Sequence, residues 1–177
     1  MHIWPVPNSY SKTLPAAGAA GSFWEERKDR HHCGIDIYAP LNSDVLAIES
    51  GRIVETGVFT SPHTLPYWNK TYYIVLQNES GLFCKYAEID GISVKEGQIV
   101  KAGEIIGKVA RVLNLEKIDN TSPEYIKNLQ RKNISCMLHF ELYRAWPVQF
   151  EKYVGGNSFI GQKPKNLVNP AEYLKKL

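Results

Sequence analysis

His32, Asp36 and His139 are the residues whose types could do chemistry together, as metal ligands or as acid–base groups. Side chains alternate along a strand, so His32 and Asp36 share one face of an extended segment, and His139 shares a face with Glu141 in a later one. On a straight strand His32 and Asp36 would stand about 13 Å apart, because each residue adds about 3.3 Å. A bend at Gly34 would bring them together. The spacing leaves both a metal site and purely structural hydrogen bonding open.

The elements that must position these residues are short strands. Runs rich in β-branched and aromatic residues, bounded by Gly, Pro, Asn or Ser, predict a mostly β fold. The expected strands are 34–38, 44–48, 51–56, 72–77, 82–88, 105–109 and 136–143. Segments 45–54 and 94–107 share a pattern with a glycine at a turn, which indicates an internal duplication. Two copies predict a two-lobed sheet or barrel rather than a solenoid.

Helical signals occur in two places. Ser122-Pro123-Glu124 combines an N-cap Ser, a Pro at the first helical position and an early Glu, and it predicts a helix through Lys132. Asn169-Pro170 predicts a second start before a short helix over 173–177. Residues 111–133 therefore form a polar, partly helical excursion between two strands, either a lid or a surface ornament.

Composition excludes several classes of protein. The 177 residues, 44% hydrophobic and 22% charged, fit one compact domain. A net charge of +3 excludes the clustered basic excess of a dedicated nucleic-acid binder. No apolar run approaches the roughly 20 residues of a membrane span. The amino terminus lacks a signal-peptide pattern, so the sequence as written predicts a cytoplasmic protein, or an extracytoplasmic one if a signal has been removed.

Two motifs resemble those of the lysostaphin-type zinc metallopeptidases. The run His32-Cys33-Gly34-Ile35-Asp36 resembles their His-x-Gly-x-Asp segment, and Leu138-His139-Phe140-Glu141 resembles the end of their His-x-His-Phe-Glu strand. The likeness continues, in the same order, through the hairpin at 45–54, the central strands at 72–87, the Val-x-x-Gly-Gln-x-Val turn in 94–107 and the carboxyl end at 169–174. It implies a single peptidase-like domain over 1–177, with 111–133 as an insertion. The implied fold is the duplicated hybrid motif, a barrel or sandwich of antiparallel strands with a C-terminal helix.

The resemblance implies a Zn²⁺ ion held by His32, Asp36 and His139, with Glu141 and Tyr86 supporting these ligands. Three protein ligands leave a fourth position for water, which is the pattern of a catalytic rather than a structural zinc site. The implied activity is metallopeptidase hydrolysis of peptide bonds in peptidoglycan-type substrates by a water that the zinc activates.

The sequence departs from this family at two catalytic positions. The residue two before His139 is Met137, and the residue after Tyr86-Ala87 is Glu88, where the family has histidines. Those histidines would accept the proton of water and stabilise the oxyanion, and losing such a group typically costs about 10² to 10⁴ in rate.

Glu88 is left with three roles: general base, fourth metal ligand that closes the site, or surface carboxylate. Strand alternation places Cys84, Tyr86 and Glu88 on one face, from which the Glu88 carboxylate would point at the zinc site. His31 and His63 are further candidates for the missing catalytic groups. His31 has the wrong parity to share the Asp36 face, and His63 lies in a loop.

Aromatic residues near these strands predict a groove for an extended peptide or glycan, with ordinary packing as the alternative. They are Trp24, Tyr67, Trp68 and Tyr143.

Other functional classes stay open beside a weakened peptidase. One is an inactive, zinc-containing binding module for cell-wall peptide or a protein partner, in which case the chain is a pseudoenzyme. A more remote one is a histidine phosphocarrier, because the His-x-Gly-Ile-Asp run also resembles the active segment of glucose-permease phosphotransfer domains.

Overall fold

The computed structural model describes residues 3–147 and 151–175, and antiparallel strands dominate it. The mostly β fold class is thereby confirmed. The strands are β1 (His31–His32), β2 (Ile35–Tyr38), β3 (Asp44–Leu46), β4 (Gly51–Thr60), β5 (Thr71–Asn78), β6 (Phe83–Asp90), β7 (Ile99–Val100), β8 (Ile105–Val109), β9 (Met137–Tyr143), β10 (Tyr153–Val154), β11 (Asn157–Ser158) and β12 (Leu167–Val168). The helices are a short 3-10 turn (Leu115–Lys117), α1 (Glu124–Arg131) and α2 (Ala171–Leu174).

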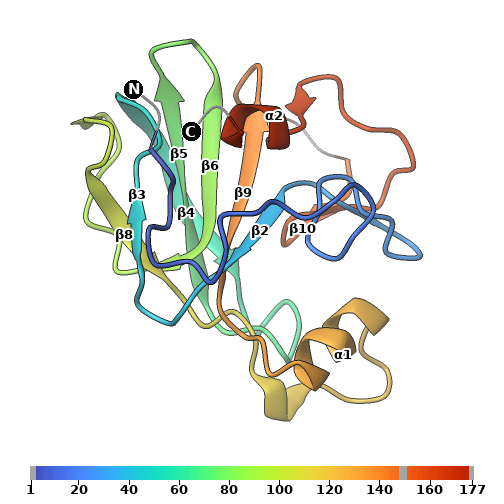
Figure 1. Cartoon of the computed structure of the whole chain (residues 1–177). Helices are drawn as coiled ribbons and strands as arrows, with labels where there is room; N and C mark the ends of the chain where they lie inside the picture. Colours follow the sequence, from blue (N-terminus) through green and yellow to red (C-terminus); the bar gives the residue numbers. More distant parts are fainter. Residues whose placement is uncertain (1–2, 148–150, 176–177) are drawn as a thin grey trace.

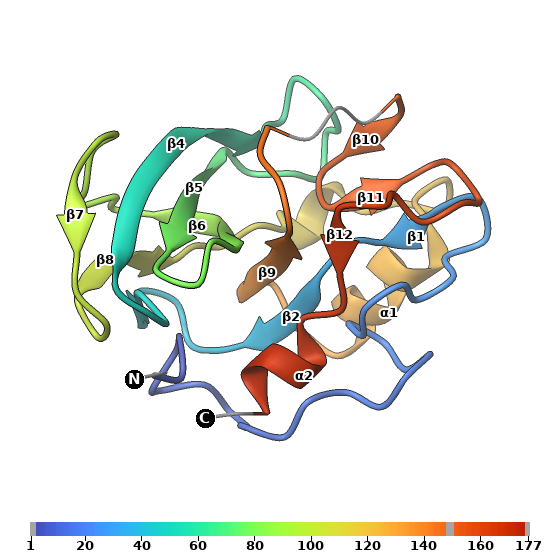
Figure 2. The same ribbon diagram turned by 90° about the horizontal axis from the view of Figure 1, so that it is seen from above.

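The main sheet has the order β12-β9-β6-β5-β4-β7, with β2 paired to β9 and β8 paired to both β3 and β6. Strand β9 is therefore central, since β2, β6 and β12 all pair with it. The two similar segments lie against each other, because β3 pairs with β8 and β4 pairs with β7. A three-stranded sheet, β1-β11-β10, lies on the opposite side of the molecule from β7 and β8 (Figure 2).

The two faces of the main sheet differ in character. In β2, Ile35 and Ile37 point into the main hydrophobic core, and in β9, Leu138 and Phe140 do the same. Because side chains alternate, Asp36 and His139 point to the other face, where the two residues are direct partners across the β2–β9 pair. The alternation of apolar and polar residues therefore positions the site.

The excursion at 111–133 has a small core of its own. Helix α1 buries Ile126, which packs in a cluster with Trp68, Leu113 and Met137. This cluster joins the excursion to the start of β9 and to the loop between β4 and β5. Figure 1 shows α1 at the opposite end of the strands from α2.

Several boundaries differ from the sequence-based expectations. Helix α1 begins at Glu124 with Pro123 as N-cap and no side-chain cap, so Ser122 is not the cap. Helix α2 begins earlier than expected, at Ala171, whose N–H donates to Asn169 Oδ1. Strands β7, β10, β11 and β12 have two residues each, which is too short for a periodic pattern. Within the described residues, no helix is long and apolar enough to span a membrane.

Candidate metal centre

Three side chains converge where β1, β2 and β9 meet. His32 Nε2 lies 3.1 Å from Asp36 Oδ1 and 3.0 Å from His139 Nδ1, and the Asp36 and His139 atoms are 3.1 Å apart. The exposed fractions of the three residues are 1%, 8% and 2%. Across residues 3–147 and 151–175, no other group of three His, Cys, Asp or Glu donors could hold an ion.

The donor set and its spacing fit zinc. Atoms bound tetrahedrally to one zinc ion at about 2.0–2.1 Å lie about 3.3 Å from one another, close to the separations seen here. Two imidazoles and one carboxylate are ligands that zinc accepts, and they leave one coordination position for a further ligand. The residues therefore fit the ion that the resemblance implies.

The close approach of His32 and Asp36 depends on a break in the strand. His32 belongs to β1, which pairs with β11, whereas Asp36 belongs to β2, which pairs with β9. Gly34 lies at the break between β1 and β2, as expected. A glycine is needed there because its neighbours pack closely, not because its φ is positive. A Cβ atom at Gly34 would lie 2.5 Å from the Phe140 carbonyl oxygen and 2.9 Å from the His139 ring.

Outer hydrogen bonds fix which nitrogen each imidazole presents to the centre. The Ser22 carbonyl can only accept, so His32 Nδ1 donates to it at 2.8 Å and leaves Nε2 facing the centre. His139 Nε2 lies 2.8 Å from Glu141 Oε1, which leaves Nδ1 facing the centre. Glu141 therefore orients the His139 ring. Tyr86 does not, because its ring is in the core and its hydroxyl accepts from the Ile48 N–H.

In the metal-free cluster, burial and neighbouring groups shift the pKa values of the three side chains in opposite directions. Burial lowers the pKa of His32, and the nearby Arg27 lowers it further. Burial would also lower the pKa of His139, but hydrogen bonds to Asp36 and Glu141 outweigh it and raise that pKa to about 9. Burial would raise the pKa of Asp36, yet the two histidines hold it well below its usual value. A cation bound at this centre would therefore displace a proton from His139.

Arg27 forms the outer wall of the centre, and no sequence pattern marks it as a site residue. Its Nε and Nη2 donate to Glu25 Oε2 at 3.0 and 2.8 Å, and its Nη1 donates to Asn157 Oδ1 at 3.2 Å. Nη2 also lies 3.4 Å from Asp36 Oδ2, and the guanidinium stacks 4.2 Å from the Tyr125 ring centroid. In the sequence Arg27 sits in the charged run 25–30, which resembles an ordinary solvated surface.

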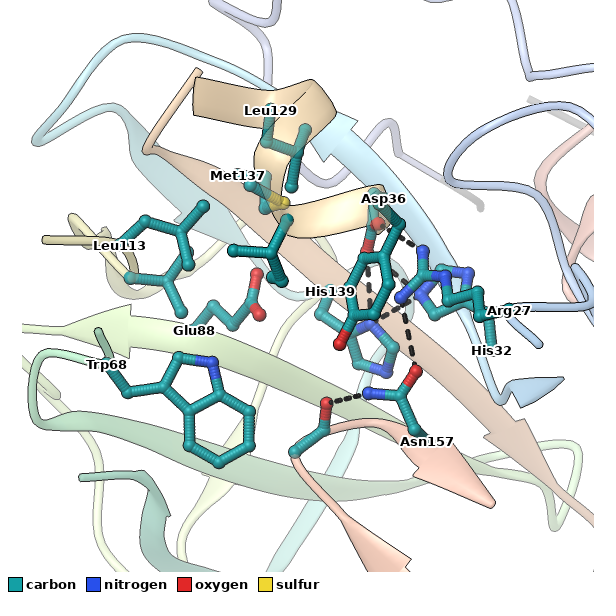
Figure 3. A pocket seen from close by; sticks show the side chains of 14 residues that line it. Arg27, His32, Asp36, Trp68, Glu88, Leu113, Leu129, Met137, His139 and Asn157 are labelled. Atoms are coloured by element: carbon teal, nitrogen blue, oxygen red, sulfur yellow. Dashed lines mark hydrogen bonds and ion pairs between the residues drawn. The ribbon is translucent and has the colours of Figure 1, made fainter. Parts of the chain in front are cut away.

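Glu88 forms the opposite wall. A β-bulge, rather than regular strand alternation, points its side chain there. Tyr72 pairs with Ile89 and Tyr73 with Ala87, so Glu88 is the extra residue of a β-bulge, with φ 63°. Cys84 and Tyr86 point into the core, so the expectation that they share a face with Glu88 is wrong. The bulge turns Glu88 to the face of His139, as Figure 3 shows.

The Glu88 carboxylate is buried and incompletely paired. Its residue is 9% exposed, which is inconsistent with a surface carboxylate, and its Oε2 has no hydrogen-bond partner among the described residues. Burial, together with the negative Asp36, raises the pKa of Glu88 to about 8. Glu88 does not join the cluster of donor atoms around His32, Asp36 and His139. The geometry therefore places it beside the centre.

Glu88, Arg27 and the three donor residues line one cavity of about 30 Å³. Asn157 of β11 and Gly155, in the turn between β10 and β11, also line it. An apolar wall is formed by Trp68, Val112, Leu113, Tyr125, Ile126, Leu129 and Met137. Several of these residues belong to the 111–133 excursion, so α1 roofs the centre. A volume of about 30 Å³ has room for water molecules but not for a peptide.

The remaining candidates lie away from the donor atoms. His31 is stacked on Trp24 with 4.6 Å between ring centroids, and His63 is exposed in its loop. Trp68 does line the cavity, and Tyr67 packs in the same small cluster. Tyr143 is fully buried and donates to Glu141, so it lines no groove.

Comparisons with known proteins agree with this geometry. The family model described as Peptidase family M23 matches residues 30–150. No curated protein sequence shows significant similarity to the chain.

Among solved structures, the antimicrobial peptidase lysostaphin from Staphylococcus simulans has 20% identity and a TM-score of 0.57, covering 99% of this chain and 56% of that one. The chain in the SpoIIQ–SpoIIIAH pore-forming complex has 19% identity and a TM-score of 0.54, covering 97% and 89%. LytU has 18% identity and a TM-score of 0.52, covering 95% and 89%. At these identities the likeness shows the lysostaphin-like fold, and the family match spans more than half of the sequence. The chain therefore belongs to peptidase family M23.

Proposed function

We propose that the protein is a zinc-dependent endopeptidase that hydrolyses peptide bonds in peptidoglycan-type substrates. The observation that carries the proposal is a buried His–Asp–His donor cluster beside a buried carboxylate with an unpaired oxygen. Unpaired buried polar atoms are costly, so their presence in a cavity beside ligand atoms supports a functional role. Membership of the M23 family supports the same reaction class.

His32, Asp36 and His139 would hold the ion, which, when bound, polarises the scissile carbonyl and activates water. In its ionised form, which a metal cation bound nearby would favour, Glu88 Oε2 accepts the proton of the attacking water, because Glu88 is the carboxylate that faces the cavity without belonging to the donor cluster. Met137 and Glu88 stand where the resemblance expects histidines. Met137 can neither donate nor accept a proton, so turnover rests on Glu88 and is slower than with both histidines.

The test is hydrolysis of purified peptidoglycan and of a glycine-rich peptide by the zinc-loaded protein, measured as newly released amino groups. We expect His32→Ala to lose both zinc and activity. We expect Glu88→Gln to keep zinc and to lose about 10² to 10⁴ in rate. Glu116→Gln, at an exposed position in the excursion, is the matched control and should not change the rate. An unchanged rate for Glu88→Gln would exclude Glu88 as the base.

A second candidate is a zinc-containing binding module that recognises cell-wall peptide without cleaving it. The observation that favours it is the roof formed by Tyr125, Ile126 and Leu129, which leaves a cavity of about 30 Å³. The same assay separates the two functions. Sedimentation of the protein with peptidoglycan, without release of amino groups by a zinc-loaded sample, would support the binding module and overturn the peptidase.

A further inference from the structure

Arg27 is a buried cation at the edge of a centre that would hold another cation. Its side chain is 7% exposed, and it comes from the charged segment before β1. Two like charges in a poorly solvated region repel each other, so Arg27 would weaken the binding of a metal ion if it acted through charge alone. Its position therefore needs another physical reason.

That reason lies in how Arg27 engages Asp36. The Oδ1 atom of Asp36 faces both histidines at 3.1 Å, while Oδ2 lies 3.4 Å from Arg27 Nη2. A free carboxylate can rotate and can offer a cation one oxygen or two. With Oδ2 held by the guanidinium, Asp36 presents Oδ1 alone to the centre.

Arg27 is itself fixed on several sides, so it can impose this orientation. Glu25 accepts two of its hydrogen bonds, Asn157 accepts a third, and the Tyr125 ring of α1 covers its face. These partners come from three separate parts of the chain. The planar guanidinium suits such an arrangement, because its donors form a rigid fork that a lysine does not have.

We propose that Arg27 is a positioning residue that restricts Asp36 to one metal-binding oxygen and thereby sets the zinc affinity of the centre. The proposal rests on the zinc site of the proposed function but not on turnover. Residues that orient metal ligands typically contribute about 10- to 100-fold in metal affinity.

The experiment measures zinc dissociation constants by competition with a chromophoric chelator for the whole chain and three variants. We expect Arg27→Met to bind zinc about 10- to 100-fold more weakly. Arg27→Lys keeps the charge but loses the fork, and we expect it to be weakened at least about 10-fold. Arg30→Met is the matched control, because Arg30 pairs with Asp29 and packs on Phe159, outside the metal cavity. We expect it to bind zinc like the unaltered chain.

The direction of the change is decisive. If Arg27 acted only through its charge, Arg27→Met would bind zinc more tightly and Arg27→Lys would be unchanged, and either result would overturn the proposal. The visible absorption of the cobalt-substituted protein should change in Arg27→Met if Asp36 changes its coordination. If Arg27→Met fails to fold, Glu25→Gln is the substitute variant, because Glu25 accepts two hydrogen bonds from Arg27. It should also weaken zinc binding, and unchanged binding would overturn the proposal.

The outcomes separate this proposal from the proposed function. An unaltered chain that binds zinc but releases no amino groups would overturn the peptidase and leave the role of Arg27 standing. Equal zinc affinities in all variants would overturn the role of Arg27 and leave the peptidase standing. Absence of zinc binding by the unaltered chain would overturn both, and the cobalt spectrum would show it independently.

Discussion

Glu88 shows how one backbone torsion can decide what a residue does. Strand alternation, applied without interruption, turns residue 88 toward the core side of β6, where Cys84 and Tyr86 lie. The bulge with φ 63° adds one residue and reverses the direction of the side chain. A positive φ in a non-glycine residue carries strain that the surrounding pairs must compensate, and such residues concentrate at functional sites. No sequence pattern marks this bulge, so strand alternation pointed Glu88 at the site only by wrongly placing Cys84 and Tyr86 on the same face.

The buried Glu88 carboxyl should make stability depend on pH in the zinc-free protein. Its pKa is raised from 4.5 to about 8, so the folded state holds a proton that the unfolded state has lost between these values. The contribution of Glu88 is therefore fully present below about pH 4.5 and is lost as the pH rises through about 8. Glu88→Gln should remove this loss and become a few kcal/mol more stable, relative to the unaltered chain, on going from pH 5 to pH 8.5.

Denaturant unfolding of both proteins at these two pH values measures the difference. A difference that does not change with pH would show that Glu88 titrates normally. The comparison between variants is necessary because His139, with a pKa of about 9, also titrates in part of this range.

At the scale of elements, the pairing of β2 with β9 brings together donor residues that the sequence indicated through a family resemblance. Asp36 and His139 are cross-strand partners, and each lies in a strand with clear alternation of apolar and polar residues. The break between β1 and β2 was predictable from Gly34, the small residue between the two ligands. What the sequence did not reveal is that Gly34 is needed for its lack of a side chain rather than for its backbone freedom.

Gly34→Ala should therefore be severely destabilising. Its methyl group would lie 2.5 Å from the backbone oxygen of Phe140, which cannot move without separating β2 from β9. We expect a loss of more than about 3 kcal/mol and loss of zinc binding, as for other overpacked interior sites. Gly161→Ala is the control, because nothing lies within 4 Å of a Cβ atom there. Thermal unfolding checks both, and a well-folded Gly34→Ala protein would show that β9 can shift.

The excursion at 111–133 and Met137 form one structural unit. Met137 is 3% exposed and packs with Leu113 and Ile126, so the position that the resemblance assigns to a histidine serves here as an apolar support for α1. An imidazole at that position would need a partner for both of its nitrogens. A methionine at this position and the presence of the roof are thus physically consistent with each other.

Placing a histidine at this position should be unfavourable. Met137→His would place a polar ring in the apolar cluster, and we expect a loss of about 1–3 kcal/mol in the free energy of unfolding. Met137→Leu keeps the volume and apolar character, so it should cost less than about 1.5 kcal/mol. Equal stabilities for the two variants, measured by thermal unfolding, would show that α1 does not pack tightly against the side chain at position 137.

At the scale of the whole molecule, the site residues that could not be predicted are those whose partners lie far away along the chain. Arg27 meets Asn157, 130 residues later, and also Tyr125 in the excursion. Such contacts leave no periodic signal, because the three residues sit in a charged loop, a two-residue strand and a short helix. The donor residues were recognisable because their motifs resemble those of a known family, while spacing alone left a purely structural role open. Their outer wall became visible only in three dimensions.

Zinc should stabilise the whole fold. An ion that binds the folded state alone adds about 2.7 kcal/mol when its free concentration is 100 times its dissociation constant. For a chain of this size we expect the melting temperature to rise by about 5–10 °C on zinc addition and to return on chelation. His139→Ala should abolish the shift, while His63→Ala, at an exposed loop position, should retain it. A zinc-induced shift that persists in His139→Ala would place the ion elsewhere.

The separation of the donor residues along the chain also has a kinetic consequence. His139 lies 107 residues from His32 and 103 from Asp36, so the full donor set exists only after a long loop has closed. Contacts of such high sequence separation form slowly. During refolding, uptake of zinc would therefore follow the pairing of β2 with β9. The rate of zinc uptake would then report the rate at which this pairing forms.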